Sequence, residues 1–220
     1  ALYHYAHLPH IFKPQRRIDT NVVPGSEEKL DMLQYCVQTL TERGYVFIGM
    51  DHFAKPDDEL SIALKEGFLQ RNFQGYSTYA DCDLVAIGVS SIGKIGSTYS
   101  QNERDIDAYY AALDAGHLPI MRGYQLDQDD ILRRNIIQDL MCRFSLDYQI
   151  YESVFGIPFS RYFAAELEDM KQLETLGLVR LKSHSLTVTP KGRFLIRNIA
   201  MVFDYHLRHK ETKAKYSQTV

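Results

Sequence analysis

The chain has 220 residues, 45% of them hydrophobic, which is enough for one large domain or two small ones with a sizeable core. Its net charge of −3 excludes a global positive field that would attract nucleic acid or an anionic membrane. No run of about 18 apolar residues is present, so we expect no membrane span, and the three scattered cysteines favour the reducing cytoplasm over a disulfide-rich compartment.

The first fifty residues predict a strand, a helix and a second strand. Residues 1–12 read as a strand and a loop, and "YVFIGM" at 45–50 reads as a buried strand. Between them, residues 26–44 place apolar side chains three and four apart, with Ser26 as a predicted N-cap and Gly44 as a predicted stop. This order favours a parallel sheet that binds ligands at the carboxyl ends of its strands. Because the chain opens within a predicted strand, we expect it to be a piece of a longer protein.

Glycines and serines surround the next apolar run. A short helix is predicted after Pro56, with acidic residues in its first turn. A loop is expected at 74–76, followed by a buried strand at 84–89 and a glycine- and serine-rich segment at 90–96. Glycines in such a place allow the backbone to approach a ligand or another strand closely.

The remainder of the sequence has mainly helical periodicity. Helices are expected at 102–115, 127–143, 147–155, 160–176 and 191–209, with a β-hairpin within 177–192 and a frayed tail from Lys210. Helices followed by a hairpin resemble a winged helix, and residues 191–215 carry seven Lys/Arg against two acids, so a DNA-binding module is one alternative. The helix before the hairpin has more acids than bases, which disfavours docking against phosphates.

The histidines and cysteines form no recognisable metal motif. No two cysteines lie within four residues of each other, and each is expected to be a small buried apolar residue. Pro9 breaks any helix through the histidines at 4, 7 and 10, and we expect none of these, nor His206 and His209, to be a ligand. Asp51 and His52 end a predicted strand and form either an acid–base pair or a hydrogen-bonded strand terminus.

Several long motifs together carry a family resemblance. They are "YAHLP" at 5–9, "GYVFIGMDHFAKPDDEL" at 44–60, "RNFQGYST" at 71–78, "DLVAIGVSSIGKIG" at 83–96 and "TPKGRFLIRNI" at 189–199. The sequence closely resembles the oxygen-independent coproporphyrinogen III oxidase (dehydrogenase) family of radical-SAM enzymes from Tyr5 nearly to its end. In that family, two propionates of coproporphyrinogen III are oxidatively decarboxylated to vinyl groups, giving protoporphyrinogen IX in anaerobic haem biosynthesis.

The resemblance implies the fold class and the domains. The fold would be α/β plus α: residues 1–50 would be the last strands and helix of a partial TIM-like radical-SAM barrel. Residues 51–220 would be a family-specific, mainly helical C-terminal domain with a small winged-helix-like β-hairpin. The early barrel strands and the CxxxCxxC motif of the family are absent from this sequence, so the resemblance covers the C-terminal half of the enzyme.

The resemblance also implies the cofactors and the site. S-adenosylmethionine (SAM) would contact Ala6, Phe73, Gln74 and Ile92, and the [4Fe–4S] cluster would be bound by the missing N-terminal half. Arg71 is a candidate for a substrate propionate, because arginine pairs with carboxylates in bidentate fashion. Weaker candidates of the same kind are Arg16, Arg17 and Arg122. No catalytic residue is assigned.

The expected partners follow from the same reading. They are coproporphyrinogen III, the N-terminal half of the same enzyme and an external electron donor, with no nucleic acid or membrane, in a cytoplasmic monomer. We expect these 220 residues alone neither to form the cluster nor to turn over. The alternative is a stand-alone haem- or porphyrin-binding paralogue without catalysis, which the oxidase-like motifs "RNFQGY" and "MDHFA" disfavour.

Overall fold

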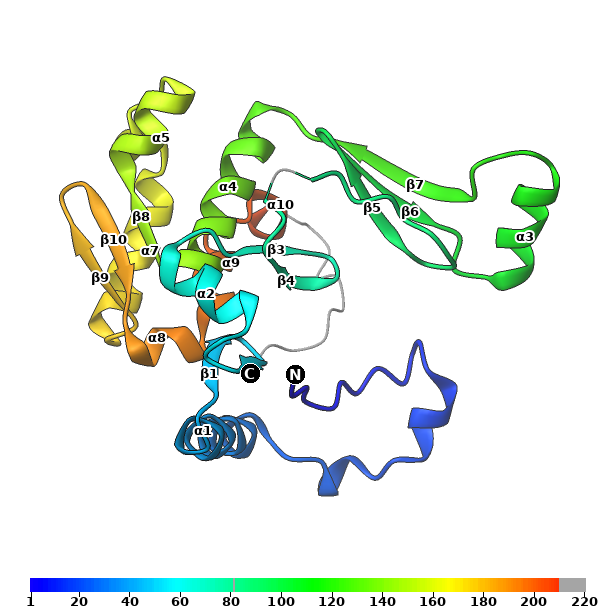
Figure 1. The fold of residues 1–220 in the computed structure, drawn as a ribbon, viewed down its shortest axis with the longest axis horizontal. Coiled ribbons are helices and arrows are strands. Elements are labelled where there is room, and N and C mark those ends of the chain that lie inside the picture. Colours follow the sequence, from blue (N-terminus) through cyan, green and yellow to red (C-terminus); the bar gives the residue numbers. More distant parts are fainter. Residues whose placement is uncertain (81, 210–220) are drawn as a thin grey trace.

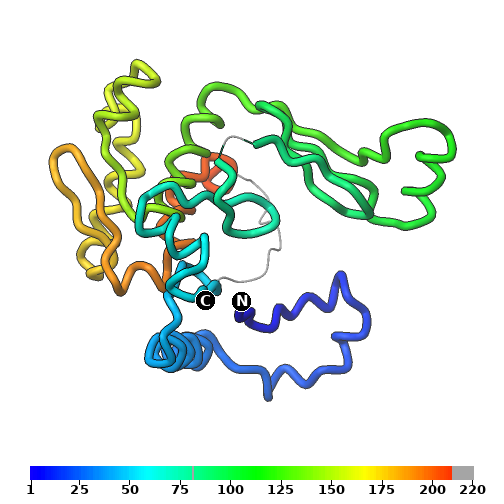
Figure 2. The backbone as a smooth tube through the Cα atoms, in the orientation of Figure 1, coloured from blue at the N-terminus to red at the C-terminus, as the bar shows by residue number. Residues whose placement is uncertain are grey.

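The chain is a mixture of helices and small antiparallel sheets in a computed structural model that describes residues 1–80 and 82–209. The expected fraying from Lys210 lies outside the described residues. One end of the molecule is a packed body around α4 (Gln128–Arg143), and β5, β6, β7 and α3 extend from it as an arm (Figure 1). In Figure 2 the N-terminal segment begins beside the body, where the Leu2 N–H donates to the Asp51 carbonyl (2.8 Å), and then loops outward before it returns.

The elements run as follows. The helices are η1 (Lys13–Arg17), η2 (Thr20–Val22), α1 (Ser26–Glu42), α2 (Glu59–Glu66), α3 (Ile106–Asp114), α4 (Gln128–Arg143), α5 (Tyr148–Phe155), α6 (Phe159–Tyr162), α7 (Ala164–Thr175), α8 (Pro190–Phe194), α9 (Ile196–Met201) and α10 (Tyr205–Arg208). The strands are β1 (Val46–Gly49), β2 (His52–Ala54), β3 (Gln70–Asn72), β4 (Gly75–Ser77), β5 (Ile92–Ile95), β6 (Thr98–Asn102), β7 (Ile120–Gln125), β8 (Ser145–Asp147), β9 (Val179–Lys182) and β10 (Ser185–Val188).

The described sheets are antiparallel, so the prediction of a parallel sheet in the first fifty residues is wrong. Residues 1–12 form no strand, and β1 pairs instead with β2, with Val46 opposite Ala54. The turn between them uses a left-handed Met50 (φ 55°). The remaining pairings are β3–β4, β5–β6–β7 and β8–β10–β9. A local hairpin therefore supplies the pairing that the predicted first strand would have given.

The helix predictions hold where the sequence carries end signals. Helix α1 is present, with Gly25 rather than Ser26 as N-cap, and it ends before Gly44 (φ 80°) as predicted. Asp58 caps α2 through the backbone N–H of Leu60 (2.9 Å). Asp127 and Asp130 form a reciprocal capping box at the start of α4.

The central segment differs most from the predictions. The expected buried strand at 84–89 is wrong: Val85 and Ile87 are 66% and 83% exposed, and only Leu84 makes a bridge, to Lys94. The strand lies later, in β5, and the expected loop at 74–76 belongs to the β3–β4 hairpin. Two polar strands, β6 and β7, were not predicted, because they lack apolar alternation and take their order from pairing with each other.

The C-terminal elements follow the predicted order with shorter pieces. The expected helices at 147–155 and 160–176 appear as α5 and as α6 plus α7, and that at 102–115 shortens to α3 behind β6. The predicted hairpin is β9–β10, joined to the unpredicted β8 as a third strand. The expected helix at 191–209 is divided into α8, α9 and α10, with non-helical backbone at Leu195 (ψ 28°) and an N-cap at Asp204.

Two apolar clusters hold the body together. The larger joins α4 to α9 and the β8–β10 sheet through fully buried side chains, among them Ile136, Leu140, Phe159, Phe163 and Phe203. The smaller joins β1, β2, α2 and β4 through Ile48, Ala54, Ala63, Leu69, Tyr76 and Cys142. Leu64 and Met141 pack against both clusters, so α4 connects them.

A buried arginine fixes the position of α4. The Nη1 atom of Arg133 donates to Glu166 of α7 (2.8 Å) and to the carbonyl of Phe203 (3.2 Å), and its Nε donates to Asp129 (2.7 Å). Its guanidinium also lies 5.1 Å from the centre of the Phe163 ring. Arg133 and Glu166 are only 9% and 6% exposed, so each depends on the other for its charge to be compensated.

Removing one partner of this pair should destabilise the fold. We expect Glu166→Leu to lower the free energy of unfolding by about 3–5 kcal/mol, because Arg133 stays buried, loses the buried one of its two carboxylates and keeps only the more exposed Asp129. Breaking the exposed Lys171–Glu168 pair of α7 with Glu168→Leu should lower the free energy of unfolding by less than about 1 kcal/mol. Urea denaturation measures both values. Equal losses of unfolding free energy in the two variants would show that Arg133 does not need Glu166.

The close approach of α8 to β9 gives a second stability prediction. A Cβ at Gly192 would collide with the carbonyl of Leu178, a backbone group that cannot move aside cheaply. We expect Gly192→Ala to lower the free energy of unfolding by about 2–3 kcal/mol through overpacking. Gly123→Ala is the control, since its Cβ would meet only the Tyr99 carbonyl at 3.4 Å. Thermal and urea unfolding measure the free energy of unfolding of both variants. A Gly192→Ala variant as stable as the wild type would contradict this packing.

Candidate functional site

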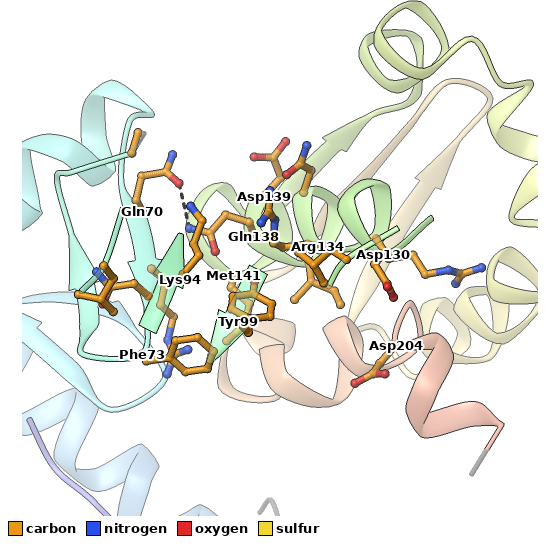
Figure 3. Close-up of a pocket in the computed structure, with 18 of the residues that line it drawn as sticks. Gln70, Phe73, Lys94, Tyr99, Asp130, Arg134, Gln138, Asp139, Met141 and Asp204 are labelled. Carbon is orange, nitrogen blue, oxygen red and sulfur yellow. Dashed lines mark hydrogen bonds between the residues drawn. The ribbon is translucent and has the colours of Figure 1, made fainter. Parts of the chain in front are cut away.

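The candidate site is a cavity of about 870 Å³ beside α4. Its walls come from β3 and the residues after β4, from β5 and β6, and from α4, α5 and α10. In Figure 3, Gln70, Gln138 and Asp139 lie at one end, and the Phe73 and Tyr99 rings lie together away from them. The volume is within the range of small-molecule sites, and the wall combines aromatic, amide and charged groups.

The β3–β4 hairpin places Phe73 on this wall. Asn72 pairs with Gly75, so Phe73 and Gln74 form the tip, where the Asn72 side chain accepts a hydrogen bond from the Gln74 backbone N–H (2.8 Å). Gly75 has φ 128°, and a Cβ there would lie 3.2 Å from His52 Nε2. Phe73 is 53% exposed and meets Tyr99 edge to face with ring centres 5.4 Å apart. The hairpin therefore presents an uncovered aromatic ring.

The four residues of the expected SAM set are distributed unequally. Phe73 lines the cavity, and Gln74 lies next to it in the exposed turn. Ile92 begins β5 opposite Gln101, half-buried, and is not on the cavity wall. Ala6 is exposed in the N-terminal segment, where its carbonyl accepts from Gln15 Nε2 (3.1 Å). Of the four, only Phe73 lines the cavity, and Gln74 is its neighbour in the turn.

Arg71 lies on the cavity wall as a cation. Its guanidinium is 5.9 Å from the centre of the Tyr76 ring, and its buried Nε has no hydrogen-bond partner among the described residues. Tyr76 is anchored by donating to the Met141 carbonyl (3.0 Å), and burial raises its pKa, so it stays neutral beside Arg71. An arginine held against an aromatic ring with a free donor suits an anionic ligand group.

The weaker arginine candidates do not line this cavity. Arg16 donates to the Pro9 carbonyl (3.0 Å) in the N-terminal segment, and Arg17 is exposed next to it. Arg122 of β7 donates to Gln101 Oε1 (2.9 Å). The contacts of Arg16 and Arg122 therefore stabilise the N-terminal segment and the β6–β7 pair.

Carboxylates on the wall are already engaged. Asp130 accepts from His206 Nε2 (2.7 Å) and from the Tyr124 hydroxyl (3.0 Å). Burial raises the pKa of Asp130, but these hydrogen bonds and the one from the Asp127 backbone outweigh it, so that the pKa falls. Asp139 accepts from the Tyr151 hydroxyl (2.6 Å) and faces Arg143 (3.3 Å). The carboxylates of Asp130 and Asp139 are thus held by hydrogen bonds within the structure.

Residues of this wall that sequence reasoning missed include Lys94, Tyr99 and Arg134. Lys94 lies within a quoted motif but was not singled out, and Tyr99 lies in an unpredicted strand. Arg134 precedes Gln138 by one helical turn on α4, and Gln138 donates to Gln70 (2.9 Å). No local pattern distinguishes these positions, because their proximity arises from the docking of β3 and β5 beside α4.

The Asp51–His52 pair is hydrogen-bonded, as both readings of it require. His52 Nδ1 lies 2.7 Å from Asp51 Oδ1, and Arg197 is 3.5 Å from the other carboxylate oxygen. The His52 ring meets the Tyr76 ring edge to face at 5.2 Å. The pair lies at the start of β2, away from the cavity wall.

The cysteines and histidines do not converge on a metal. Across residues 1–80 and 82–209, no three His, Cys, Asp or Glu side chains are grouped so as to hold an ion. Cys142 is buried as expected, whereas Cys36 is half-buried and Cys82 is exposed, so the expectation of burial is wrong for Cys82. The described residues therefore do not fit an iron–sulfur cluster. Among them, no helix is long and apolar enough to cross a membrane.

Comparisons with known proteins agree on one family. The model for the HemN C-terminal domain matches residues 126–195. Oxygen-independent coproporphyrinogen III oxidases of Salmonella typhimurium and Pseudomonas aeruginosa are 45% and 48% identical, over 100% and 94% of this chain and 48% and 45% of those proteins. That of Thermostichus vulcanus is 45% identical, over 96% of this chain and 65% of that protein. The chain thus spans about half the length of the first two relatives.

A solved structure gives the same match in three dimensions. Coproporphyrinogen III oxidase (HemN) from Escherichia coli, described as a radical SAM enzyme, superposes with a TM-score of 0.88 at 48% identity. The superposition covers 92% of this chain and 47% of that one. The mixed fold of helices and small antiparallel sheets is therefore the fold of the matched part of that enzyme.

Thiol chemistry provides a test of this geometry. Burial raises the pKa of Cys142 to about 12, so at pH 8 only about one molecule in ten thousand carries its thiolate. Cys82 is exposed beside the cavity. We expect iodoacetamide to label Cys82 readily and Cys142 only after unfolding in urea, as read by mass spectrometry of the peptides. Equal labelling of both in the folded chain would contradict this placement of α4.

Proposed function

Because the chain is homologous to the C-terminal half of oxygen-independent coproporphyrinogen III oxidases, we propose that it forms that part of an enzyme converting coproporphyrinogen III to protoporphyrinogen IX. The observation that carries the proposal is the match of the whole chain at 45% identity, with the motif residue Phe73 exposed on a large cavity. In this reaction two propionate side chains each lose a hydrogen and carbon dioxide and become vinyl groups.

SAM with a [4Fe–4S] cluster would supply, when bound, the radical that removes the hydrogen. The cluster has no ligand set among the described residues, so this chain's contribution is to bind and orient. Phe73 would offer its ring face to a nucleoside, since more than half of its surface is uncovered. Gln74, beside it, can donate and accept hydrogen bonds through its amide. Ala6 and Ile92 would contribute backbone contact and apolar fit from other segments of the chain.

Arg71 would bind a carboxylate of the substrate. Its buried Nε lacks an acceptor among the described residues, and it shares the cavity wall with Phe73. Arginine meets a carboxylate through two parallel hydrogen bonds, which fixes the orientation of a propionate as well as binding it. A propionate so held would keep the tetrapyrrole next to the proposed SAM contacts.

The domain organisation remains part of the proposal. Residues 1–50 would complete a radical-SAM barrel supplied by an N-terminal half, and residues 51–220 would form the C-terminal domain with its winged-helix-like hairpin. The match to the HemN C-terminal domain at 126–195 supports the second region. The buried cluster of Ile48, Ala54 and Ala63 spans the boundary, so the two regions would share packing there. An external electron donor would serve the assembled enzyme.

The proposal predicts a specific loss of SAM affinity. In the chain joined to the cluster-bearing half, Phe73→Ala should raise the Kd for SAM about tenfold by removing the stacking surface, and Phe73→Tyr should retain most of the affinity. Phe68→Ala is the matched control, since Phe68 is 42% exposed and does not line the cavity. Equilibrium dialysis with labelled SAM gives the Kd, and anaerobic assay of the vinyl product gives the activity.

A second experiment tests whether the cluster and the turnover require the N-terminal half. The 220 residues alone should give neither cluster absorbance after anaerobic reconstitution nor product, because the described part of the chain has no cluster ligands. Product from these residues alone would contradict the proposal. Porphyrin binding without turnover, even with the cluster-bearing half present, would favour the non-catalytic binding paralogue instead.

A further inference from the structure

We propose that Lys94 and Arg134 bind carboxylates of the tetrapyrrole that are not those being decarboxylated. Lys94 comes from β5 and Arg134 from α4, and both line the cavity that Phe73 and Arg71 share. This inference rests on the proposed function, and it assigns the binding of the retained propionates to two residues outside the expected site.

Both cations lack an anionic partner in the structure. Among residues 1–80 and 82–209, neither Lys94 nor Arg134 makes an ion pair, and Nη1 of Arg134 is buried without a hydrogen-bond partner. By contrast, Arg133, the neighbour of Arg134, has Asp129 and Glu166. A buried guanidinium N–H without an acceptor is rare in folded proteins, because the lost hydration is not replaced. The other guanidinium nitrogens of this half-buried side chain on the cavity wall can donate to a ligand.

The carboxylates in the same cavity have other contacts. Asp130 is engaged by His206 and Tyr124, and Asp139 by Tyr151 and Arg143. Asp83 accepts from the backbone N–H of Gly96 (2.8 Å). Asp204 accepts from the backbone N–H of Leu207 at the start of α10 (2.9 Å). The side-chain ion pairs of the wall thus leave Lys94, Arg134 and Arg71 as its uncompensated cations within the described part of the chain.

The distribution of groups indicates the kind of ligand. Phe73 and Tyr99 form an aromatic surface, Gln70 and Gln138 are hydrogen-bonded to each other above it in the view of Figure 3, and Asp130 and Asp204 lie at the far side. Arg134 lies one helical turn from Gln138 and therefore on the same side of α4. A tetrapyrrole with carboxylates on several edges can pack against the aromatic surface and reach separate cations at once. The substrate has four propionates, of which two remain in the product.

This arrangement would orient the substrate. Carboxylates that are retained would be held by Lys94, the cross-strand partner of Tyr99, and by Arg134 on α4, which would fix the tetrapyrrole in one register against the aromatic surface. Two separate cations bind a polycarboxylate in a single register more firmly than one cation can, since each loses its partner if the ring rotates. Lys94 and Arg134 are thus positioning and specificity residues.

Binding of a stable porphyrin tests the inference without turnover. Coproporphyrin III is the oxidised, fluorescent form of the substrate ring with the same four carboxylates, and its tetramethyl ester has none of their charges. In the polypeptide carrying this chain, Arg134→Gln and Lys94→Gln should each weaken coproporphyrin III binding about tenfold and leave ester binding unchanged. Arg180→Gln removes the same charge from an exposed position outside the cavity and should change neither.

A second readout locates the ligand. Cys82 lines the cavity, so bound coproporphyrin III should slow its alkylation in the wild-type chain and much less in Arg134→Gln at the same ligand concentration. Arg134→Lys, which retains the charge, should recover part of the affinity. Unchanged binding in both glutamine variants, with wild-type binding intact, would overturn the inference and leave the proposed function standing. Failure of the wild-type polypeptide to bind coproporphyrin III would overturn both.

Discussion

The buried ion pair between Arg133 of α4 and Glu166 of α7 is the constraint on which the rest of the structure depends. Two charges that are 9% and 6% exposed need compensation, which Glu166 receives from Arg133, and Arg133 from Glu166 and Asp129, so the pair restricts how α4 and α7 can be placed. The same guanidinium reaches the Phe203 carbonyl, which ties the C-terminal helices to this pair. With α4 held in this way, its other faces are fixed as well.

One helix therefore serves both the core and the cavity. Ile136 and Leu140, four residues apart, are fully buried in the larger apolar cluster, whereas Arg134 and Gln138 have the same spacing on a face that lines the cavity. Any shift of α4 that opened the core would also move this wall of the site. Met141 extends this coupling, because it packs against both clusters and its carbonyl accepts the Tyr76 hydroxyl.

The side of the cavity formed by the β3–β4 hairpin has little cover among the described residues. Phe73 at the hairpin tip is 53% exposed, and residues 1–25 lie mostly exposed away from the body (Figure 2). Uncovered aromatic surface of this kind commonly marks a binding site or an interface. Under the proposed function, the exposed hairpin tip and the N-terminal segment would face SAM and the other half of the enzyme, since the chain matches about half of its relatives' length.

Local chemistry let the sequence determine its helices, its family and the exposed pair at the tip of "NFQGY". Acidic caps at Asp58 and Asp127 and a glycine stop at Gly44 act within one turn, so they are readable without a partner. The strands were decided by tertiary structure: β6 and β7 lack apolar alternation and exist through pairing with each other, and in the apolar run at 84–89 the side chains of Val85 and Ile87 stay exposed. The positions of Lys94 and Arg134 on one cavity were decided there too. The two residues are far apart in sequence and come together only because β5 lies beside α4. No local pattern indicates which distant charges will lack a partner.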